Sequence, residues 1–408
     1  RSRLGRRHAY MFAAPIPIAL FFIAIFNPPP GLNHALLCLW ATVSVIGLRI
    51  SMSVFHTPHL AMGGELSNAY IERTKVMAWN NFATWIGGTA ISLIALTFFF
   101  KATPEYPRGL LNPAPYLPFS MLAATATLVI LFASAWFTRD QIPRLPKPPE
   151  TQPPFSPFEF LKDIGKVLSN RNYVWLLAAY FALSLMTGIR DTLGLYGGTY
   201  YWGFPSELLR WYSLGSLVGF VSALTLTPRL HGLWGKRTVI IWSAAALMVF
   251  PALGFILREL GWMFPNGDPR LLPTLVSLSA VSYAVGAILN ISVMSALADV
   301  ADENEVKYGV RQEGVLYSTR ALFAKLDTAI GAALAGAVLT FIAFPEKAQP
   351  GEIDPLVIEK LGLFLGPVSM IPGLFAVLFY SRFNISREDH AETRAKIDRI
   401  RAAPATVE

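Results

Sequence analysis

The stretch GGELSNAYIERT, residues 63–74, lies between two long apolar runs of the sequence, 34–62 and 76–100. Each run is longer than the ~20 apolar residues that a helix needs to cross a hydrocarbon core of ~30 Å. The segment between them carries charged side chains at Glu65, Glu72 and Arg73. The sequence therefore predicts two membrane-spanning helices joined by a polar connection in water.

Long apolar runs alternate with polar connections along the rest of the chain as well. Of the 408 residues, 53% are hydrophobic and only 15% are charged, whereas about a quarter of the residues of a soluble protein are charged. The single cysteine, Cys38, excludes a disulfide framework within the chain. We therefore predict an all-α polytopic membrane protein with ten visible spans, 9–26, 34–62, 76–100, 116–137, 172–196, 207–228, 238–257, 272–297, 315–344 and 361–383.

Lysine and arginine are divided unevenly between the two alternating sets of connections. Most of the 34 basic residues fall in one set, which comprises 1–8, 63–75, 138–171, 229–237, 298–314 and the tail 384–408. Connections rich in Lys and Arg remain on the cytoplasmic side of a membrane, so we predict that this set is cytoplasmic. The formal net charge of +8 then follows from topology, and no nucleic-acid partner is expected.

A weak internal repeat divides the spans into two groups. The motif Gly-Arg-Arg at 5–7 opens the first span, and Gly-Lys-Arg at 235–237 opens the seventh, about 230 residues later. The charged segment 65–75 has a counterpart at 298–314, at nearly the same offset. We predict four parts: an N-terminal bundle 1–137, a proline-rich cytoplasmic linker 138–171, a C-terminal bundle 172–383 and a cytoplasmic tail 384–408. Two spans of the second group lack a counterpart, so we expect about 60 further upstream residues with two more helices.

Three stretches resemble signatures of known transporters. RSRLGRRHAY (1–10) resembles the cytoplasmic signature between helices 2 and 3 of major facilitator proteins. TPHLAMGGELSNAYIERT (57–74) and ADVADENEVKYGVRQEGVLYSTRALFAKLDTAIGAAL (298–334) resemble the two signatures of the glycoside–pentoside–hexuronide:cation symporters, the melibiose-permease family. The resemblance covers essentially the whole chain. It implies two pseudo-symmetric six-helix bundles, with helices 3–6 in the first visible bundle and helices 7–12 in the second.

The resemblance also implies a function. Members of that family couple the movement of a sugar, glycoside or uronide to Na⁺, Li⁺ or H⁺ by alternating access. Lys325 falls where the family has a lysine of helix 11 near the substrate and cation. The melibiose carriers have an aspartate at the position of His56 and an arginine near Asn81. The identity of the sugar and that of the coupling ion therefore remain open.

Charged and polar side chains within the spans are the candidate substrate and ion-coupling residues. A charge at the bilayer centre costs ~2.5–3.5 kcal/mol on insertion scales, so an intramembrane charge is a functional candidate by default. His56 is included because imidazole titrates near neutral pH, and Trp85 because aromatic rings stack on sugars. The alternative for each is a structural ion pair, a packed side chain or an interfacial anchor. The candidates are Lys325, Arg190, Asp191, Arg49, His56, Asn81, Trp85 and Asp327.

Two other groups of polar residues are interpreted differently. Arg320, nearer the cytoplasmic end of its span, is predicted to be a pairing residue or to contact lipid headgroups. Charged residues of the cytoplasmic connections are predicted to form contacts in one transport state and break them in the other, because solvated ion pairs trap neither state. Stabilisation of helix N-termini is the alternative for the carboxylates. The gating candidates are Arg6, Arg7, Glu65, Glu72, Arg73, Asp299, Asp302, Arg311 and Glu313.

Other classes of function fit the sequence less well. A carrier of a lysolipid or another amphiphile, built on the same fold, is the main alternative. An enzyme is disfavoured because we find no phosphate-binding loop, no metal cluster and no nucleophile–base set. His56 and His59 have a metal spacing, but no third ligand is near in sequence. We expect no cofactor besides the coupling ion, a carbohydrate substrate, a lipid bilayer environment, a monomer, and a location in the bacterial inner membrane.

Overall fold

The computed structural model describes residues 5–65, 70–144, 165–166, 168–308, 313–345, 348–349, 351–385 and 387–402 of the 408. Within these ranges the regular elements are all helices. The chain divides into two compact units, Arg1–Pro154 and Phe155–Glu408. The boundary between the units lies inside the stretch 138–171, which the sequence predicts to be a linker.

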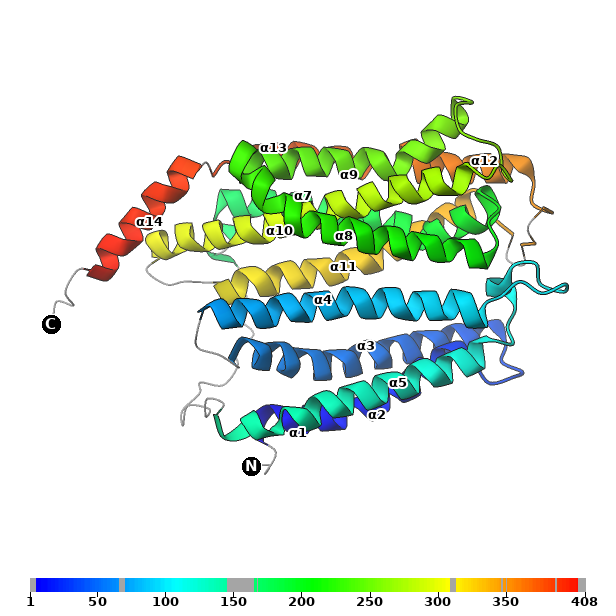
Figure 1. Ribbon diagram of the computed structural model, residues 1–408, viewed down its shortest axis with the longest axis horizontal. Helices are drawn as coiled ribbons and strands as arrows, with labels where there is room; N and C mark the ends of the chain where they lie inside the picture. The colour runs from blue at the N-terminus through cyan, green and yellow to red at the C-terminus, as the bar shows by residue number, and fades with distance from the viewer. Residues whose placement is uncertain are drawn as a thin grey trace. The chain divides into compact units, whose positions relative to one another are not determined.

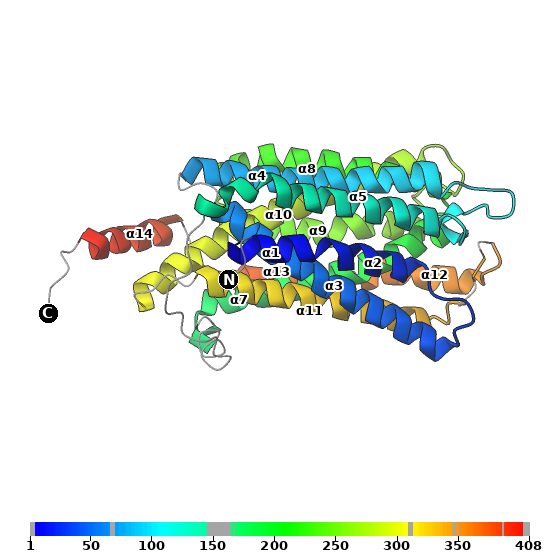
Figure 2. The same ribbon diagram turned by 90° about the horizontal axis from the view of Figure 1, so that it is seen from below.

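The first unit is a bundle in which α2 lies against both α3 and α5. Its core contains Met11, Ile18 and Phe55, and all three side chains are buried. Pro15 separates α1 from α2, because proline has no backbone N–H to donate to the preceding turn. Figures 1 and 2 show these helices side by side in two views: α1 (Gly5–Ala13), α2 (Pro15–Phe26), α3 (His34–Glu65), α4 (Tyr70–Ile94) and α5 (Tyr116–Phe137).

The second unit is a larger bundle in which α10 packs against α8 and α9, and α7 packs against α11 and α13. Its main core surrounds Tyr173, Leu176 and Met186 of α7. A final helix follows the last span and contacts α10. The helices are α7 (Arg171–Tyr196), α8 (Ser206–Trp234), α9 (Lys236–Glu259), α10 (Leu271–Tyr308), α11 (Glu313–Phe341), α12 (Pro355–Leu363), α13 (Met370–Arg382) and α14 (Arg387–Ala402).

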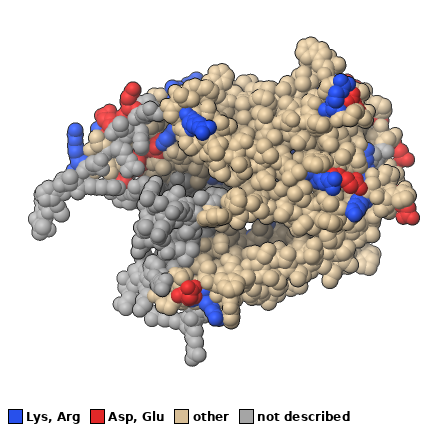
Figure 3. Space-filling model, in the orientation of Figure 1, with Lys and Arg blue, Asp and Glu red and all other residues tan. Residues whose placement is uncertain are grey.

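The surface of the helices is apolar, as expected for a protein in lipid. Phe137 is 80% exposed, Phe341 77% and Trp242 66%, although large apolar side chains of soluble proteins are mostly buried. Over α8, α9 and α10, on the face drawn in Figure 3, the charged side chains lie near the helix ends and the middle carries none. Eight helices of the described residues are long and apolar enough to cross a membrane. The predicted fold class, an all-α polytopic membrane protein, is thus confirmed.

Helix α8 coincides with a predicted span but lies outside those eight helices. Its sequence contains many Ser and Thr residues, and their hydroxyls donate to backbone carbonyls of the preceding turn, as Ser222 does to Val218 and Thr227 to Ala223. Such bonds satisfy the hydroxyl groups inside the helix, so the polar side chains do not prevent it from spanning a bilayer. At Gly219 a Cβ would collide with the backbone of Ala280, which shows how closely α8 approaches α10.

Helix α10 is longer than the sequence pattern predicts. The predicted span ends at residue 297, whereas the helix continues to Tyr308 through a segment expected to be a connection. The extension is amphiphilic: Val300 and Ala301 are fully buried, and Glu303 accepts hydrogen bonds from Asn170 and Asn172 at the start of α7. A helix persists beyond the bilayer when its apolar face has a partner of this kind.

Candidate functional site

Arg190 of α7 connects three parts of the second unit. Its Nη1 donates to the carbonyl of Leu247 over 3.1 Å and its Nη2 to that of Met248 over 2.9 Å, both in α9. Leu247 stands four residues before Pro251, which has no N–H, so its carbonyl has no α-helical donor at that position. The guanidinium therefore satisfies a backbone acceptor that the proline leaves open, and only 9% of Arg190 is exposed.

The third bond of Arg190 reaches a broken helix. Its Nε donates to the hydroxyl of Ser369 over 2.8 Å, and that hydroxyl lies 2.9 Å from the carbonyls of Leu365 and Gly366. Gly366 has a non-helical backbone with φ −90° and ψ −110°, and it separates α12 from α13 together with Pro367. Arg190 thus holds two interrupted helices in place, and the sequence analysis did not identify its partner Ser369. The sequence does indicate the other acceptor, because Pro251 in α9 leaves the carbonyl of Leu247, four residues earlier, without a helical donor.

Asp191, the next residue of α7, points in another direction. Adjacent residues on a helix are rotated by about 100°, and the side chain of Asp191 is exposed while that of Arg190 is buried. The carboxylate lies close enough to Tyr283 of α10 and to Arg190 for electrostatic interaction. The structure therefore separates two residues that the sequence pattern does not distinguish: Arg190 faces the packed interior, and Asp191 faces an open surface of the unit.

A second arginine of this unit is held by two other helices. Arg320 of α11 donates from Nη2 to Oδ1 of Asn290 in α10 over 3.0 Å. Its Cζ lies 4.4 Å from the ring centroid of Tyr180 in α7, which is within the range of a cation–π interaction. The sequence predicts a pairing or headgroup role for Arg320, which stays a prediction, and it singles out neither of these two neighbours. Among the described residues, the polar partner of Arg320 is a neutral amide.

In the first unit, Arg49 and His56 lie seven residues apart on α3, which is about two turns. Both side chains are exposed, and Arg49 lies near the middle of the helix. In the part of the unit that the structure covers, no side chain forms a hydrogen bond or an ion pair with the guanidinium of Arg49. Both residues therefore lie on one exposed stripe of α3, and their roles in substrate or ion coupling stay predictions.

The other candidates are less fully placed. Trp85 of α4 is half-buried. The side chains of Lys325, Asp327 and Asn81 lie outside the described part, although Lys325 and Asp327 belong to α11 and Asn81 to α4. Their roles stay predictions. No group of three metal-ligating side chains occurs among the residues that the structure describes.

The cytoplasmic end of the second unit is held together by an ion pair and an amide cluster. Lys236 of the Gly-Lys-Arg motif contacts both carboxylate oxygens of Asp299, at 2.8 and 2.7 Å. Asn170 caps α7 by accepting from the N–H of Tyr173 and donates to the side chain of Asn304 over 2.9 Å. Each of these contacts joins elements of the same unit.

The gating candidates are only partly described. Asp302 is 1% exposed and Asp299 6% exposed, so both carboxylates are buried within their unit. Arg7 lies at the start of α1 with a half-buried side chain, next to the buried His8, whose Nε2 lies 3.1 Å from the hydroxyl of Thr138. The gating role stays a prediction. Side chains outside the described part are those of Arg6, Glu65, Glu72, Arg73, Arg311 and Glu313.

We expect the two partners of the Lys236–Asp299 pair to differ in what their loss costs. Lys236→Met leaves a carboxylate that is 8% exposed without its ammonium, whereas Asp299→Asn leaves an ammonium that is 33% exposed and reaches water. Lys236→Met should therefore lower the free energy of unfolding by the larger amount, about 2–3 kcal/mol against about 1 kcal/mol. Thermal unfolding in detergent measures both, and an equal or inverted order would contradict the asymmetry.

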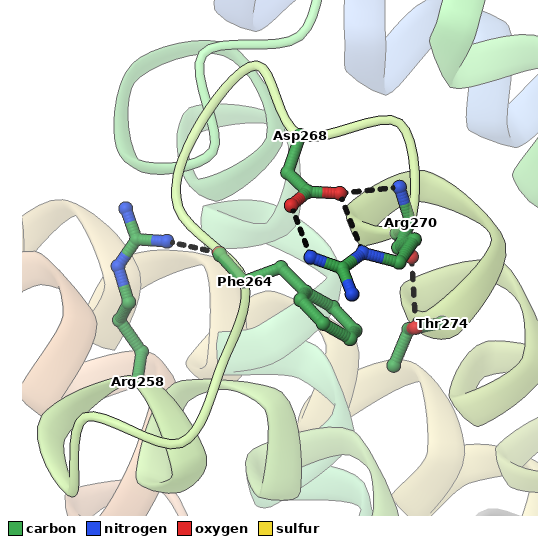
Figure 4. A network of polar contacts seen from close by, with 5 residues as sticks. All are labelled: Arg258, Phe264, Asp268, Arg270 and Thr274. Carbon is green, nitrogen blue, oxygen red and sulfur yellow. Dashed lines mark hydrogen bonds and ion pairs between the residues drawn. The ribbon is translucent and has the colours of Figure 1, made fainter.

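The outer end of the second unit carries a separate polar network (Figure 4). Arg258 donates to the carbonyl of Phe264 over 2.8 Å, and Arg270 forms an ion pair with Asp268 at 2.9 Å while its guanidinium lies over the Phe264 ring. The backbone N–H of Arg270 also donates to Asp268, and Thr274 donates to the carbonyl of Arg270. These contacts fix the connection between α9 and α10.

The hydrogen bonds from Arg270 lower the pKa of the Asp268 carboxyl below its ordinary value. A carboxyl with a lowered folded-state pKa stabilises the fold above its unfolded pKa of about 3.9, and this contribution is lost as the pH falls through the folded value. Asp268→Asn should therefore weaken the decline of thermal stability between about pH 5 and pH 3. Glu105→Gln, at an exposed carboxylate of another connection, serves as the control. An unchanged acid-side slope in Asp268→Asn would refute the assignment.

Comparisons with known proteins are consistent with this architecture. A family model described as MFS/sugar transport protein matches residues 1–387. An isoprimeverose transporter of Lactiplantibacillus pentosus is 23% identical over 97% of this chain and 80% of its own length. A putative glycoside/cation symporter of Escherichia coli (strain K12) is 23% identical over 93% of this chain and 77% of its own length.

An inner membrane symporter of the same Escherichia coli strain is 21% identical over 93% of this chain and 78% of its own length. The identities are low, but the alignments run from one unit through to the other. The family model likewise covers nearly every described helix, from α1 to the end of α13. The chain therefore belongs to the family of MFS/sugar transport proteins.

Proposed function

We propose that this protein is a secondary active transporter that carries a sugar or glycoside through the inner membrane in symport with a cation. The observation that carries the proposal is the family match over residues 1–387. The relatives add to it, since they include an isoprimeverose transporter, a glycoside/cation symporter and an inner membrane symporter. Alternating access between two bundles is the mechanism of such carriers.

Polar side chains on the two units support a transport role. Asp191 and Asn290 are exposed at positions inside helices of the second unit, and Arg49 and His56 are exposed on α3 of the first. Exposing these polar and charged side chains to lipid would be costly. The helix faces that carry them are therefore more stable in contact with water and substrate. The coupling ion is H⁺ or Na⁺. His56, which has an imidazole, is the candidate for proton coupling, and Asp191 supplies a carboxylate for either ion.

Uptake into proteoliposomes tests the proposal directly. The full-length protein is reconstituted and given a panel of radiolabelled glycosides under an imposed Na⁺ gradient, an imposed H⁺ gradient or neither. We expect accumulation of at least one glycoside above equilibrium with one of the gradients, and collapse of that accumulation when an ionophore dissipates the gradient. Absence of gradient-driven uptake for every glycoside, in vesicles shown to contain folded protein, would overturn the proposal.

A further inference from the structure

One face of α13 is apolar along its length and ends in an arginine. The exposed apolar side chains of this face are Ile371, Leu374, Phe375 and Leu378. Together with Arg382 they follow the spacing i, i+3, i+4, i+7 and i+11, which places all five on the same side of a helix. The membrane span that contains α13 ends at Arg382. The face therefore lies against lipid chains, and its charged end lies at the membrane surface.

A second arginine is anchored at the same end of α13. Arg237, at the start of α9, donates from Nη2 to the carbonyl of Ser381 over 2.9 Å. Ser381 directly precedes Arg382, so this hydrogen bond fixes the Arg237 guanidinium at the residue next to Arg382. Both arginine side chains are exposed. The span of α9 begins beside Arg237 and that of α13 ends at Arg382, so both cations belong to the cytoplasmic surface that the sequence predicts.

The surroundings of this arginine pair are positive. The connection from α8 to α9, residues 229–237, contains three basic residues and no carboxylate. Ser381 contributes a neutral carbonyl, and the carboxylate of Asp299 is occupied by Lys236 at 2.7 Å. Like charges this close repel each other, and an anion between them relieves the repulsion. The two arginines thus form a positive surface that continues directly into the exposed apolar face of α13.

We infer that Arg237 and Arg382 bind the phosphate of an anionic phospholipid of the cytoplasmic leaflet, whose acyl chain lies along the apolar face of α13. A guanidinium donates two parallel hydrogen bonds to phosphate oxygens, so two arginines can hold one phosphodiester from two sides. A zwitterionic headgroup would bring its own ammonium against these cations, which favours a headgroup without an amine, such as phosphatidylglycerol. Basic sites at the cytoplasmic ends of membrane helices attract such lipids. The inference does not depend on what the protein transports.

The test compares two lipids that share their acyl chains, dioleoyl phosphatidylglycerol and dioleoyl phosphatidylethanolamine. Native mass spectrometry of the purified full chain in detergent measures the affinity for the first bound lipid. We expect the wild type to prefer phosphatidylglycerol about tenfold or more, and each of Arg237→Gln and Arg382→Gln to bind it about fivefold more weakly. The double variant should lose the preference. Arg382→Lys, which keeps the charge but not the planar fork, should retain part of it.

Arg139→Gln is the matched control, because it removes the same charge from an exposed arginine at the cytoplasmic end of α5. Arg139 lies over the ring of Trp136 at 3.6 Å and is followed by Asp140. This variant should keep the wild-type preference. Leu378→Ser tests the apolar part of the site. It should weaken the binding of both lipids and leave the ratio between them unchanged, because it alters the contact with the chain and not with the headgroup.

Three results would overturn the inference. The first is equal binding of the two lipids to the wild type. The second is an unchanged preference in the double variant, and a carboxylate of the chain itself, such as the exposed Glu388 of α14, would then be the counter-ion. The third is binding of glycerol 1-phosphate as tight as that of the lipid, which would assign the arginines to a free phosphate ester. If Arg237→Gln fails to fold without its bond to α13, Arg382→Gln decides alone, since it leaves that bond intact.

Discussion

Arg190→Met is expected to lower the stability of the second unit by about 3 kcal/mol or more. The substitution removes three hydrogen bonds from a charged donor, each worth about 1.5–3 kcal/mol but not additive. It leaves the carbonyl of Leu247, four residues before Pro251, without a donor. In a thermal-unfolding experiment in detergent, the midpoint should fall on the order of 10 °C for a unit of this size.

The proline provides an internal control for this interpretation. Pro251→Ala restores an N–H that can donate to Leu247 within α9, so it should make Arg190 less necessary. The loss caused by Arg190→Met should therefore be smaller in the Pro251→Ala background, by about 1 kcal/mol. Ser369→Ala removes one acceptor only and should cost about 1 kcal/mol. If Arg190→Met lowers the stability equally in the wild-type and the Pro251→Ala backgrounds, the hydrogen bond from Arg190 to Leu247 does not stabilise the packing of α7 against α9.

A pure binding role for Arg190 would give a different pattern. Gradient-driven uptake would then fall while the midpoint of unfolding stayed unchanged, because a ligand contact contributes nothing to the stability of the free protein. The conservative variant Arg190→Lys separates the two further. The planar guanidinium donates to two carbonyls and a hydroxyl at once, whereas the compact ammonium of lysine cannot reach all three acceptors. A structural role therefore predicts that Arg190→Lys recovers only part of the stability lost in Arg190→Met.

The fold was largely predictable because bilayer physics leaves few solutions. Apolar runs of sufficient length must be helices in lipid, where every backbone polar group needs an internal partner. The runs at 116–137 and 34–62 therefore appear as α5 and α3, nearly at the predicted bounds. The end of α10 was not predictable in this way. Beyond residue 297 the helix depends on tertiary contacts such as that between Glu303 and Asn172, which no local pattern encodes.

The candidate site was predictable only as a set of residue types. The cost of an intramembrane charge singles out Arg190 and Asp191 equally, yet one is buried and the other exposed. Which role each takes depends on helix rotation and on acceptors more than fifty residues away in the sequence, such as Leu247. The neighbours of Arg320 could not be named from the sequence for the same reason. Sequence position shows its depth in the span, but it does not show that Asn290 and Tyr180 lie beside it.

Lys325→Ala is expected to abolish gradient-driven uptake, by about 100-fold or more, while leaving the amount of folded protein in the membrane unchanged. Lys325 lies well inside α11, a little more than one turn beyond Arg320. An ammonium at that depth costs ~2.5–3.5 kcal/mol, so removing it relieves a cost in the free protein and should not impair insertion. The resemblance to the melibiose-permease family places it near substrate and cation.

Two measurements separate binding from coupling at Lys325. Substrate counterflow needs no ion gradient, and it should survive in Lys325→Arg because that variant keeps the positive charge. If the lysine binds substrate, counterflow should fail together with driven uptake in Lys325→Ala. Survival of counterflow in Lys325→Ala would instead assign the residue to ion coupling. Lys101→Ala, at an exposed lysine after α4, should behave as wild type. Normal driven uptake in Lys325→Ala would remove Lys325 from the transport site.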